Sequence, residues 1–95
     1  MLAPNSARER IVLDGDLVIE LDMSVPMFRY VYYHYDIDSS LEATLIRRLV
    51  SPSDTFVDVG AHVGYFTLIA GKYARQVYAF EPSPATYAYL RRNLE

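Results

Sequence analysis

Two segments in the second half of the chain carry the residues best suited to chemistry. The first is an apolar run, 55–59, that continues into an acid-and-glycine turn through Gly60 and Gly64; the second is an apolar run, 77–80, that ends at Glu81. Glycine tolerates positive φ and lets a ligand lie close to the backbone. An ionised carboxylate only accepts hydrogen bonds, so Glu81 suits the two cis hydroxyls of a ribose. The sequence therefore predicts half of a nucleotide-type cofactor site.

The pattern around these residues predicts the elements that position them. Both runs are rich in β-branched and aromatic residues, which is typical of buried strands. Between them, apolar residues recur at helical spacing: Phe66, Ile69, Ala70 and Tyr73. Gly60 and Glu81 lie twenty-one residues apart, the spacing of one strand–helix–strand unit. The loop should therefore deliver a helix N-terminus to the carboxyl end of a strand, where open α/β sheets bind their ligands.

The glycine spacing separates the possible cofactors. A dinucleotide fingerprint, G-x-G-x-x-G, counted from Gly60 would place glycines where this chain has His62 and Tyr65, and no Walker-type Gly-Lys-Ser/Thr follows. The observed Asp58-x-Gly60-x-x-x-Gly64 resembles the first motif of Rossmann-like S-adenosylmethionine-dependent methyltransferases, with the middle glycine replaced. A sulfonium amino acid carries no phosphate and does not need the glycine nest that a pyrophosphate needs.

The string 57–67, followed by Phe80-Glu81-Pro82, resembles the signature of the FkbM family of methyltransferases. The resemblance covers about residues 36–95 and implies a Rossmann-like fold with S-adenosylmethionine as cofactor. It implies that Asp58 lies near the methionyl amine and that His62 occupies the place of an asparagine that contacts the cofactor. The cofactor-binding residues implied by the resemblance are Asp58, Gly60, Ala61, His62, Gly64, Tyr65, Glu81 and Pro82.

The same resemblance implies O-methylation of a small-molecule or sugar hydroxyl, by displacement at the sulfonium methyl. The catalytic residues stay unknown, since His62 is expected to bond or pack and His34 to be an ordinary strand residue. Two histidines without a third ligand at suitable spacing predict no metal site. Two other interpretations remain open. The chain could be a non-catalytic fragment or interaction module with the first half of this fold, or a nucleotide-binding module of another class.

Charge and composition limit which partners and which cellular compartment are expected. The 95 residues have a net charge of −3 and no basic cluster, which argues against a nucleic-acid partner held by charge. The lack of cysteine excludes disulfides and fits a cytoplasmic location. No apolar run suits a signal peptide or a membrane span, so no membrane partner is expected. The expected partner is a small-molecule hydroxyl acceptor.

The first half is predicted to form an N-terminal segment, 1–38, ahead of an incomplete cofactor-binding domain, 39–95. Asp14-Gly15 between apolar runs predicts a hairpin with a two-residue turn. The run 28–35 contains five aromatic residues and is predicted to be a strand, with core packing favoured over a wall of the cofactor site.

Two serines mark predicted helix starts. Ser39, with Glu42 three residues later, forms a capping box, and the helix after it is expected to cover the sheet. Its apolar stripe is Leu41, Leu45, Ile46 and Leu49. Ser83 is expected to cap a second helix, with Pro84 at its first position.

Together these elements predict an α/β fold: the N-terminal half of a Rossmann-like methyltransferase sheet, preceded by a β-hairpin and a covering helix. The resembling fold has further strands beside 55–59, for which no residues follow Glu95. An unpaired strand edge invites association. The chain is therefore expected to form a homo-oligomer or to be completed by a missing C-terminal half, and to be inactive alone.

Overall fold

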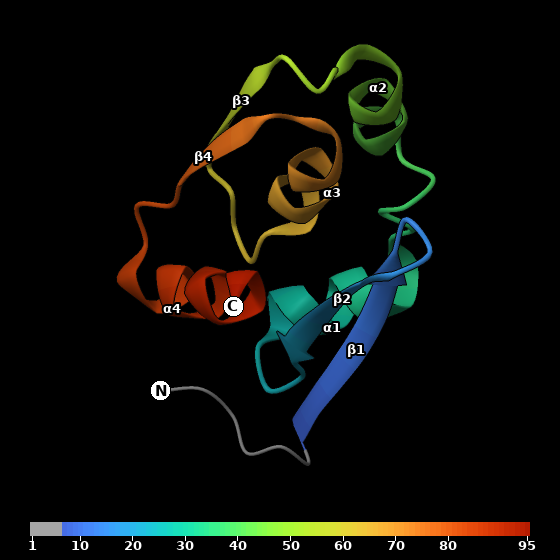
Figure 1. Ribbon diagram of the computed structural model, residues 1–95. Coiled ribbons are helices and arrows are strands. Elements are labelled where there is room, and N and C mark those ends of the chain that lie inside the picture. The colour runs from blue at the N-terminus through green and yellow to red at the C-terminus, as the bar shows by residue number, and fades with distance from the viewer. Residues whose placement is uncertain (1–6) are drawn as a thin grey trace.

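Residues 7–95 are described by the computed structural model and form two small sheets and four helices (Figure 1). Strands β1 and β2 pair antiparallel, and β3 and β4 pair parallel. The elements follow in the order β1 (Arg8–Leu13), β2 (Leu17–Asp22), α1 (Pro26–His34), α2 (Leu41–Leu49), β3 (Thr55–Val59), α3 (Tyr65–Tyr73), β4 (Gln76–Phe80) and α4 (Pro84–Leu94). Residues 1–6 of the expected N-terminal segment lie outside the described residues.

Helix α3 joins the two halves of the molecule. It connects β3 to β4 and packs against both, and it also meets β2 of the hairpin (Figure 1). Helices α1 and α4 pack on β2, whereas α2 packs mainly on α3. One buried cluster includes Leu13 and Ile19 of the hairpin, Phe28 of α1, Ile46 of α2 and Ile69 of α3. The predicted α/β architecture is confirmed, and hairpin and strand–helix–strand unit share one core.

The parallel pair fixes where the loop after β3 lies. Val59 is opposite Phe80, so the two strands end together. Beyond that point the backbone N–H groups of Gly60 and Ala61 both donate to the carbonyl oxygen of Phe80, at 2.8 and 2.9 Å. The loop is therefore hydrogen-bonded to the tip of β4.

The hairpin is confirmed, but its turn has three residues instead of two. Leu13 pairs with Leu17, which leaves Asp14, Gly15 and Asp16 in the loop. Asp14 and Gly15 have φ values of 51° and 82°, which aspartate and glycine tolerate better than most residues. The Asp14 side chain in this turn is bonded to side chains of α2 and α3.

The run 28–35 lies almost wholly in helix α1, so the predicted aromatic strand is wrong. The helix begins at Pro26, whose missing N–H costs nothing in the first turn. Phe28 is buried and Val31 and Tyr32 are half-buried, and this i, i+3, i+4 spacing places them on one helix face. The β-propensity of aromatic residues misled the interpretation, because packing overrides such preferences.

Serine side chains cap two helices, one of them a residue later than predicted. Ser40, and not Ser39, caps α2, and its Oγ accepts from the N–H of Ala43 at 3.2 Å. Ser83 caps α4 as predicted, accepting from the N–H of Thr86 at 3.4 Å. Adjacent serines explain the shift, since either could serve by type.

The buried face of α2 also differs from the predicted stripe. Ile46 is buried, as is Ala43, because these residues face α3. Leu41, Leu45 and Leu49 are 68%, 44% and 72% exposed. Residue types alone do not tell which apolar side of this helix meets its neighbour. On α4, by contrast, a leucine, Leu90, is buried.

None of the helices within residues 7–95 has the length and apolar character needed to cross a membrane.

An ionic cluster ties the hairpin turn to α2 and α3. The Asp14 carboxylate accepts from Arg47 Nε at 2.7 Å, from the Tyr73 hydroxyl at 2.5 Å, and pairs with Lys72 Nζ at 2.9 Å. Arg47 also bonds the Asp38 carboxylate. The hydrogen bond from Tyr73, with those from Lys72 and Arg47, lowers the pKa of Asp14 to about 2.

We expect Asp14→Asn to destabilise the protein by about 1–3 kcal/mol, the range for a lost hydrogen bond to a charged group. Asparagine tolerates the same positive φ, so the change tests the charge and not the turn. Because folding lowers the Asp14 pKa, its stabilisation is complete above the unfolded value of about 3.9 and is lost as the pH falls towards 2. Denaturant unfolding from pH 6 to 2 should show this loss in the wild type but not in the variant.

Asp16→Asn is the matched control for this prediction. Asp16 is in the same loop and bonds Lys72, but its side chain is 67% exposed. An exposed ion pair contributes little, so this variant should be close to wild type. Equal losses from the two variants would contradict a specific role for Asp14.

Candidate cofactor-binding site

The loop between β3 and α3 makes its turn with three left-handed residues. Gly60, His62 and Gly64 have φ values of 75°, 58° and 106°. Glycine adopts such angles at no steric cost, whereas His62 is an uncommon residue there. Glycine and asparagine suit this backbone well, which gives a structural reason for an asparagine at the position of His62 in the motif it resembles.

Glu81 at the tip of β4 bridges the loop and the start of α4. Its Oε1 accepts from the backbone N–H of His62 at 2.9 Å, and its Oε2 accepts from that of Ser83 at 3.1 Å. The side chain thus helps to hold the left-handed turn. Each carboxylate oxygen has a second acceptor position, so Glu81 can still accept hydrogen bonds from a ligand. Pro82 is exposed beside it.

Asp58 is bonded to α3 instead of to loop amides. Its Oδ2 accepts from the hydroxyl of Thr67 at 2.5 Å. This bond ties strand β3 to the first turn of the helix that follows. The implied proximity of Asp58 to a methionyl amine stays a prediction.

Gly64 and Asn93 fix the far side of the loop against α4. A Cβ at Gly64 would lie 3.2 Å from Leu90 Cδ1, so glycine allows close packing here. Asn93 Nδ2 donates to the carbonyl of Val63 at 2.9 Å, and its Oδ1 accepts from the N–H of Glu20 at 3.0 Å. Sequence reasoning missed Asn93, because its partners are distant along the chain.

A small apolar pocket, here named the α1 pocket, adjoins the loop. It has a volume of about 240 Å³ and is lined by Met27, Val31, Tyr35, Ile37, Gly60, Ala61, His62, Tyr65 and Phe66. Four predicted site residues therefore meet there, at the side of the loop that faces α1. The contribution of α1 was missed because its sequence was interpreted as a strand, although its i, i+3, i+4 spacing carried the helical signal.

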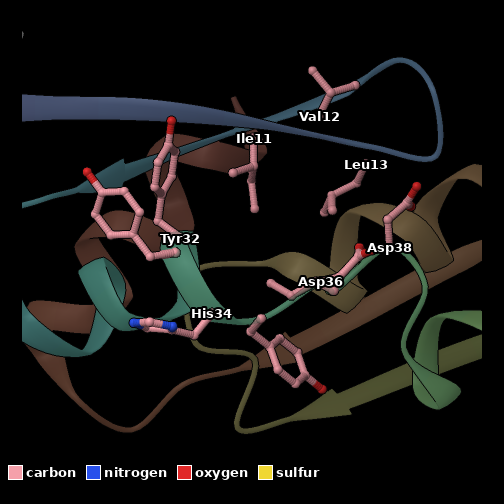
Figure 2. A pocket seen from close by; sticks show the side chains of 10 residues that line it. Ile11, Val12, Leu13, Tyr32, His34, Asp36 and Asp38 are labelled. Carbon is pink, nitrogen blue, oxygen red and sulfur yellow. The ribbon is translucent and has the colours of Figure 1, made fainter.

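A larger hollow of about 520 Å³ lies between β1 and the segment around Tyr32 to Asp38 (Figure 2). In Figure 2 Ile11 and Leu13 point towards this segment and Val12 points away. The hollow includes the carboxylate residues Asp36 and Asp38 and none of the loop residues 60–66. It shares Tyr35 and Ile37 with the α1 pocket, so the two hollows adjoin each other.

Within residues 7–95 no three histidine, aspartate or glutamate side chains are grouped so that they could hold a metal ion. His34 lies in α1 against Tyr30, at 4.9 Å between ring centroids, and not in the expected strand. The His62 ring is 6.5 Å from that of Phe28.

Comparison with protein families identifies the family to which the chain belongs. The TRM5/TYW2 methyltransferase domain matches residues 23–95. The chain belongs to this family. The matched region begins just before α1 and includes the loop and both strands of the candidate site.

Individual relatives agree with this assignment. An uncharacterized protein of Methanocaldococcus jannaschii is 31% identical over 81% of the chain and 30% of its own length. A tRNA (guanine(37)-N(1))-methyltransferase of Phytophthora infestans is 29% identical over 85% of the chain and 20% of its own length. The structure of M. jannaschii TYW2 in complex with AdoMet superposes with a TM-score of 0.66, at 24% identity, over 99% of this chain and 40% of that one. The chain thus spans a fifth to two fifths of these relatives.

The family corrects two expectations and confirms a broader one. A methyltransferase domain is confirmed, but membership of the FkbM family is wrong, since the matching family is TRM5/TYW2. The Gly60–Gly64 turn and Glu81 predicted a methyltransferase of this fold but did not distinguish the two families.

The expected partners are also wrong. A small-molecule acceptor without nucleic acid conflicts with this family and with a relative that is named as a tRNA methyltransferase. The net charge of −3 misled the interpretation, because 95 residues that span a fifth of that relative do not report the charge of a whole RNA-binding surface. The expected association along the β3 edge stays a prediction.

We expect Glu81→Gln to weaken binding of S-adenosylmethionine at least about tenfold. Hydrogen bonds to a charged acceptor contribute about 1.5–3 kcal/mol, and the amide nitrogen cannot accept from Ser83 N–H or from a ribose hydroxyl. Calorimetric titration measures the effect. Glu9→Gln, an exposed change on β1, is the control and should bind normally. An unchanged dissociation constant for Glu81→Gln would remove this residue from the site.

Proposed function

We propose that this chain is the cofactor-binding part of an S-adenosylmethionine-dependent tRNA methyltransferase of the TRM5/TYW2 type. The observation that carries the proposal is the joint placement of the Gly60–Gly64 turn and the Glu81 carboxylate at the ends of two paired parallel strands. Family membership supports the reaction class, and the Phytophthora infestans relative supports tRNA as the acceptor. We include the cytoplasmic location in the proposal, since the chain contains no cysteine.

The residues of the loop fit this cofactor. A Cβ built at Gly60 would meet nothing within 4 Å, so the space beside the loop backbone is open to a ligand. Glu81 has free acceptor positions for ribose hydroxyls. A sulfonium amino acid needs no phosphate nest, which agrees with a loop that has His62 where a dinucleotide fingerprint has glycine. The proposed contacts are those of Asp58, Gly60, Ala61, His62, Gly64, Tyr65, Glu81 and Pro82.

The contribution of these residues to transfer would be binding and orientation. Bound S-adenosylmethionine supplies the activated methyl group, and the protein gains rate by holding donor and acceptor close and in line. The hydrogen bonds that loop N–H groups donate to the Glu81 carboxylate and the Phe80 carbonyl restrict the loop backbone before the ligand binds. We assign no residue of this chain to proton transfer.

Calorimetric titration of the wild type with S-adenosylmethionine, adenosine and NAD tests the proposal. We expect binding of S-adenosylmethionine, weaker binding of adenosine, and none of NAD. Gly60→Val should abolish binding, because a β-branched residue resists the positive φ and would occupy the open space. Its thermal midpoint reports whether the fold is retained. Preference for NAD, or full binding by a folded Gly60→Val variant, would overturn the proposal.

A further inference from the structure

We propose that three arginines, on one face of the β1–β2 hairpin and on the last turn of α4, bind the phosphate backbone of the RNA substrate. They are Arg8, Arg10 and Arg92, and the surface that they form is here named the arginine face. The inference rests on the proposed function and extends it from the cofactor loop to a second surface. Arg8 and Arg10 precede the residues 23–95 that the family model matches, so the arginine face is not part of the matched region alone.

The fold brings these arginines together from segments far apart in the sequence (Figure 1). Arg8 and Arg10 flank Glu9 in strand β1, so both side chains leave the strand on the same face. Glu20 of β2 is the register partner of Arg10 and shares this face. Arg92 reaches the Glu20 carboxylate from α4, which packs on β2. The sequence shows no basic cluster because Arg92 comes beside the hairpin arginines only in the folded chain.

The Glu20 carboxylate holds the three guanidiniums around one point. Its Oε1 accepts from Arg10 at 3.4 Å and its Oε2 from Arg92 Nε at 3.2 Å, and a terminal nitrogen of Arg8 is 3.7 Å from Oε2. Burial raises the pKa of Glu20, but the hydrogen bonds and charges of Arg92 and Arg10 outweigh burial and lower it, so the carboxylate is ionised at neutral pH. Side chains that are already ordered lose less freedom when they bind a ligand.

The hollow among these side chains has the size and the charge to accept a phosphate. It has a volume of about 460 Å³ and is lined by Arg8, Glu9, Arg10, Glu20 and Arg92, so three cations face two carboxylates. Arg10 and Arg92 each make one hydrogen bond to Glu20, whereas a guanidinium has five N–H donors. Their side chains are 72% and 42% exposed. Both can therefore reach a phosphate, which a guanidinium binds through paired hydrogen bonds.

Asn93 connects the arginine face to the loop that is proposed to bind the cofactor. It follows Arg92 in α4, and its Nδ2 donates to the carbonyl oxygen of Val63 at 2.9 Å and to that of Glu20 at 3.3 Å. An RNA backbone that is bound by Arg92 would therefore have a fixed position relative to the loop.

The hollow in Figure 2 is less suited to a phosphate. Its lining includes the carboxylates of Asp36 and Asp38 and neither arginine nor lysine. Like charges brought face to face are unfavourable. We therefore assign the RNA backbone to the arginine face.

Arg10→Ala and Arg92→Ala test this assignment. The probe is a fluorescently labelled RNA hairpin, and its affinity for the chain is measured by anisotropy between about 50 and 200 mM salt. Loss of one phosphate contact makes the plot of log affinity against log salt shallower by about 0.7–0.9. We therefore expect each variant to bind the hairpin about fivefold to eightfold more weakly at about 0.1 M salt.

Arg48→Ala is the matched control. Arg48 is exposed on α2, which lies across α3 from α4 (Figure 1). This variant removes the same charge and should keep the affinity and the salt dependence of the wild type. Exposed ion pairs contribute little to stability, so all three variants should keep the thermal midpoint of the wild type. Calorimetry should give them an unchanged dissociation constant for S-adenosylmethionine.

The outcomes separate this inference from the proposed function. A wild type that does not bind the hairpin, or equal affinities of Arg10→Ala, Arg92→Ala and Arg48→Ala, overturns the inference alone. Binding to phosphatidylserine vesicles that depends on Arg10 and Arg92, with hairpin binding independent of them, also overturns it by assigning the surface to a membrane. If hairpin binding depends on both arginines but the wild type binds no S-adenosylmethionine, the inference stands and the proposed function fails.

Discussion

The parallel pairing of β3 with β4 is the constraint on which the candidate site depends. Because Val59 and Phe80 are register partners, both strands end at one edge, and the loop that follows β3 can bond the Phe80 carbonyl through two N–H groups. Glu81, one residue further, then reaches the N–H of His62. A shift of one residue in this register would reverse the faces of β4 and separate the carboxylate from the turn that it holds.

The N-terminal half supports the β3–α3–β4 unit and also contributes residues to the α1 pocket. Apolar residues of the hairpin and α1 lie in the same buried cluster as α3, and the Asp14 carboxylate connects the hairpin turn to α2 and α3. This attachment places α1 beside the loop, where Met27 and Val31 complete a pocket that the strand–helix–strand unit lacks by itself.

Residue types at a few neighbouring positions predicted those parts of the molecule that short-range interactions determine. Strand 55–59, the Gly60–Gly64 turn and the Ser83 cap each follow from residue types over a few positions, and each is present. The failures have a common cause in contacts between distant segments. Segment 28–35 is a helix because Phe28 packs into the shared core, and α2 buries Ala43 instead of a leucine row because α3 lies on that side.

The family and the substrate were mistaken for a related reason. The glycine motif predicted the reaction class but did not separate FkbM from TRM5/TYW2. Neither the net charge nor the glycine spacing identifies the acceptor. The signal for α1 was present as a helical period that its aromatic composition concealed.

Asn93 has a consequence for the order in which the chain folds. It links the last turn of α4 to backbone groups of Glu20 and Val63, which are 73 and 30 residues away in the sequence. Closing such long loops is slow compared with forming a hairpin, so β1 and β2 can pair before the loop has its final support. The segment proposed to bind the cofactor would then be among the last to become ordered, and the first to open when the end of α4 frays.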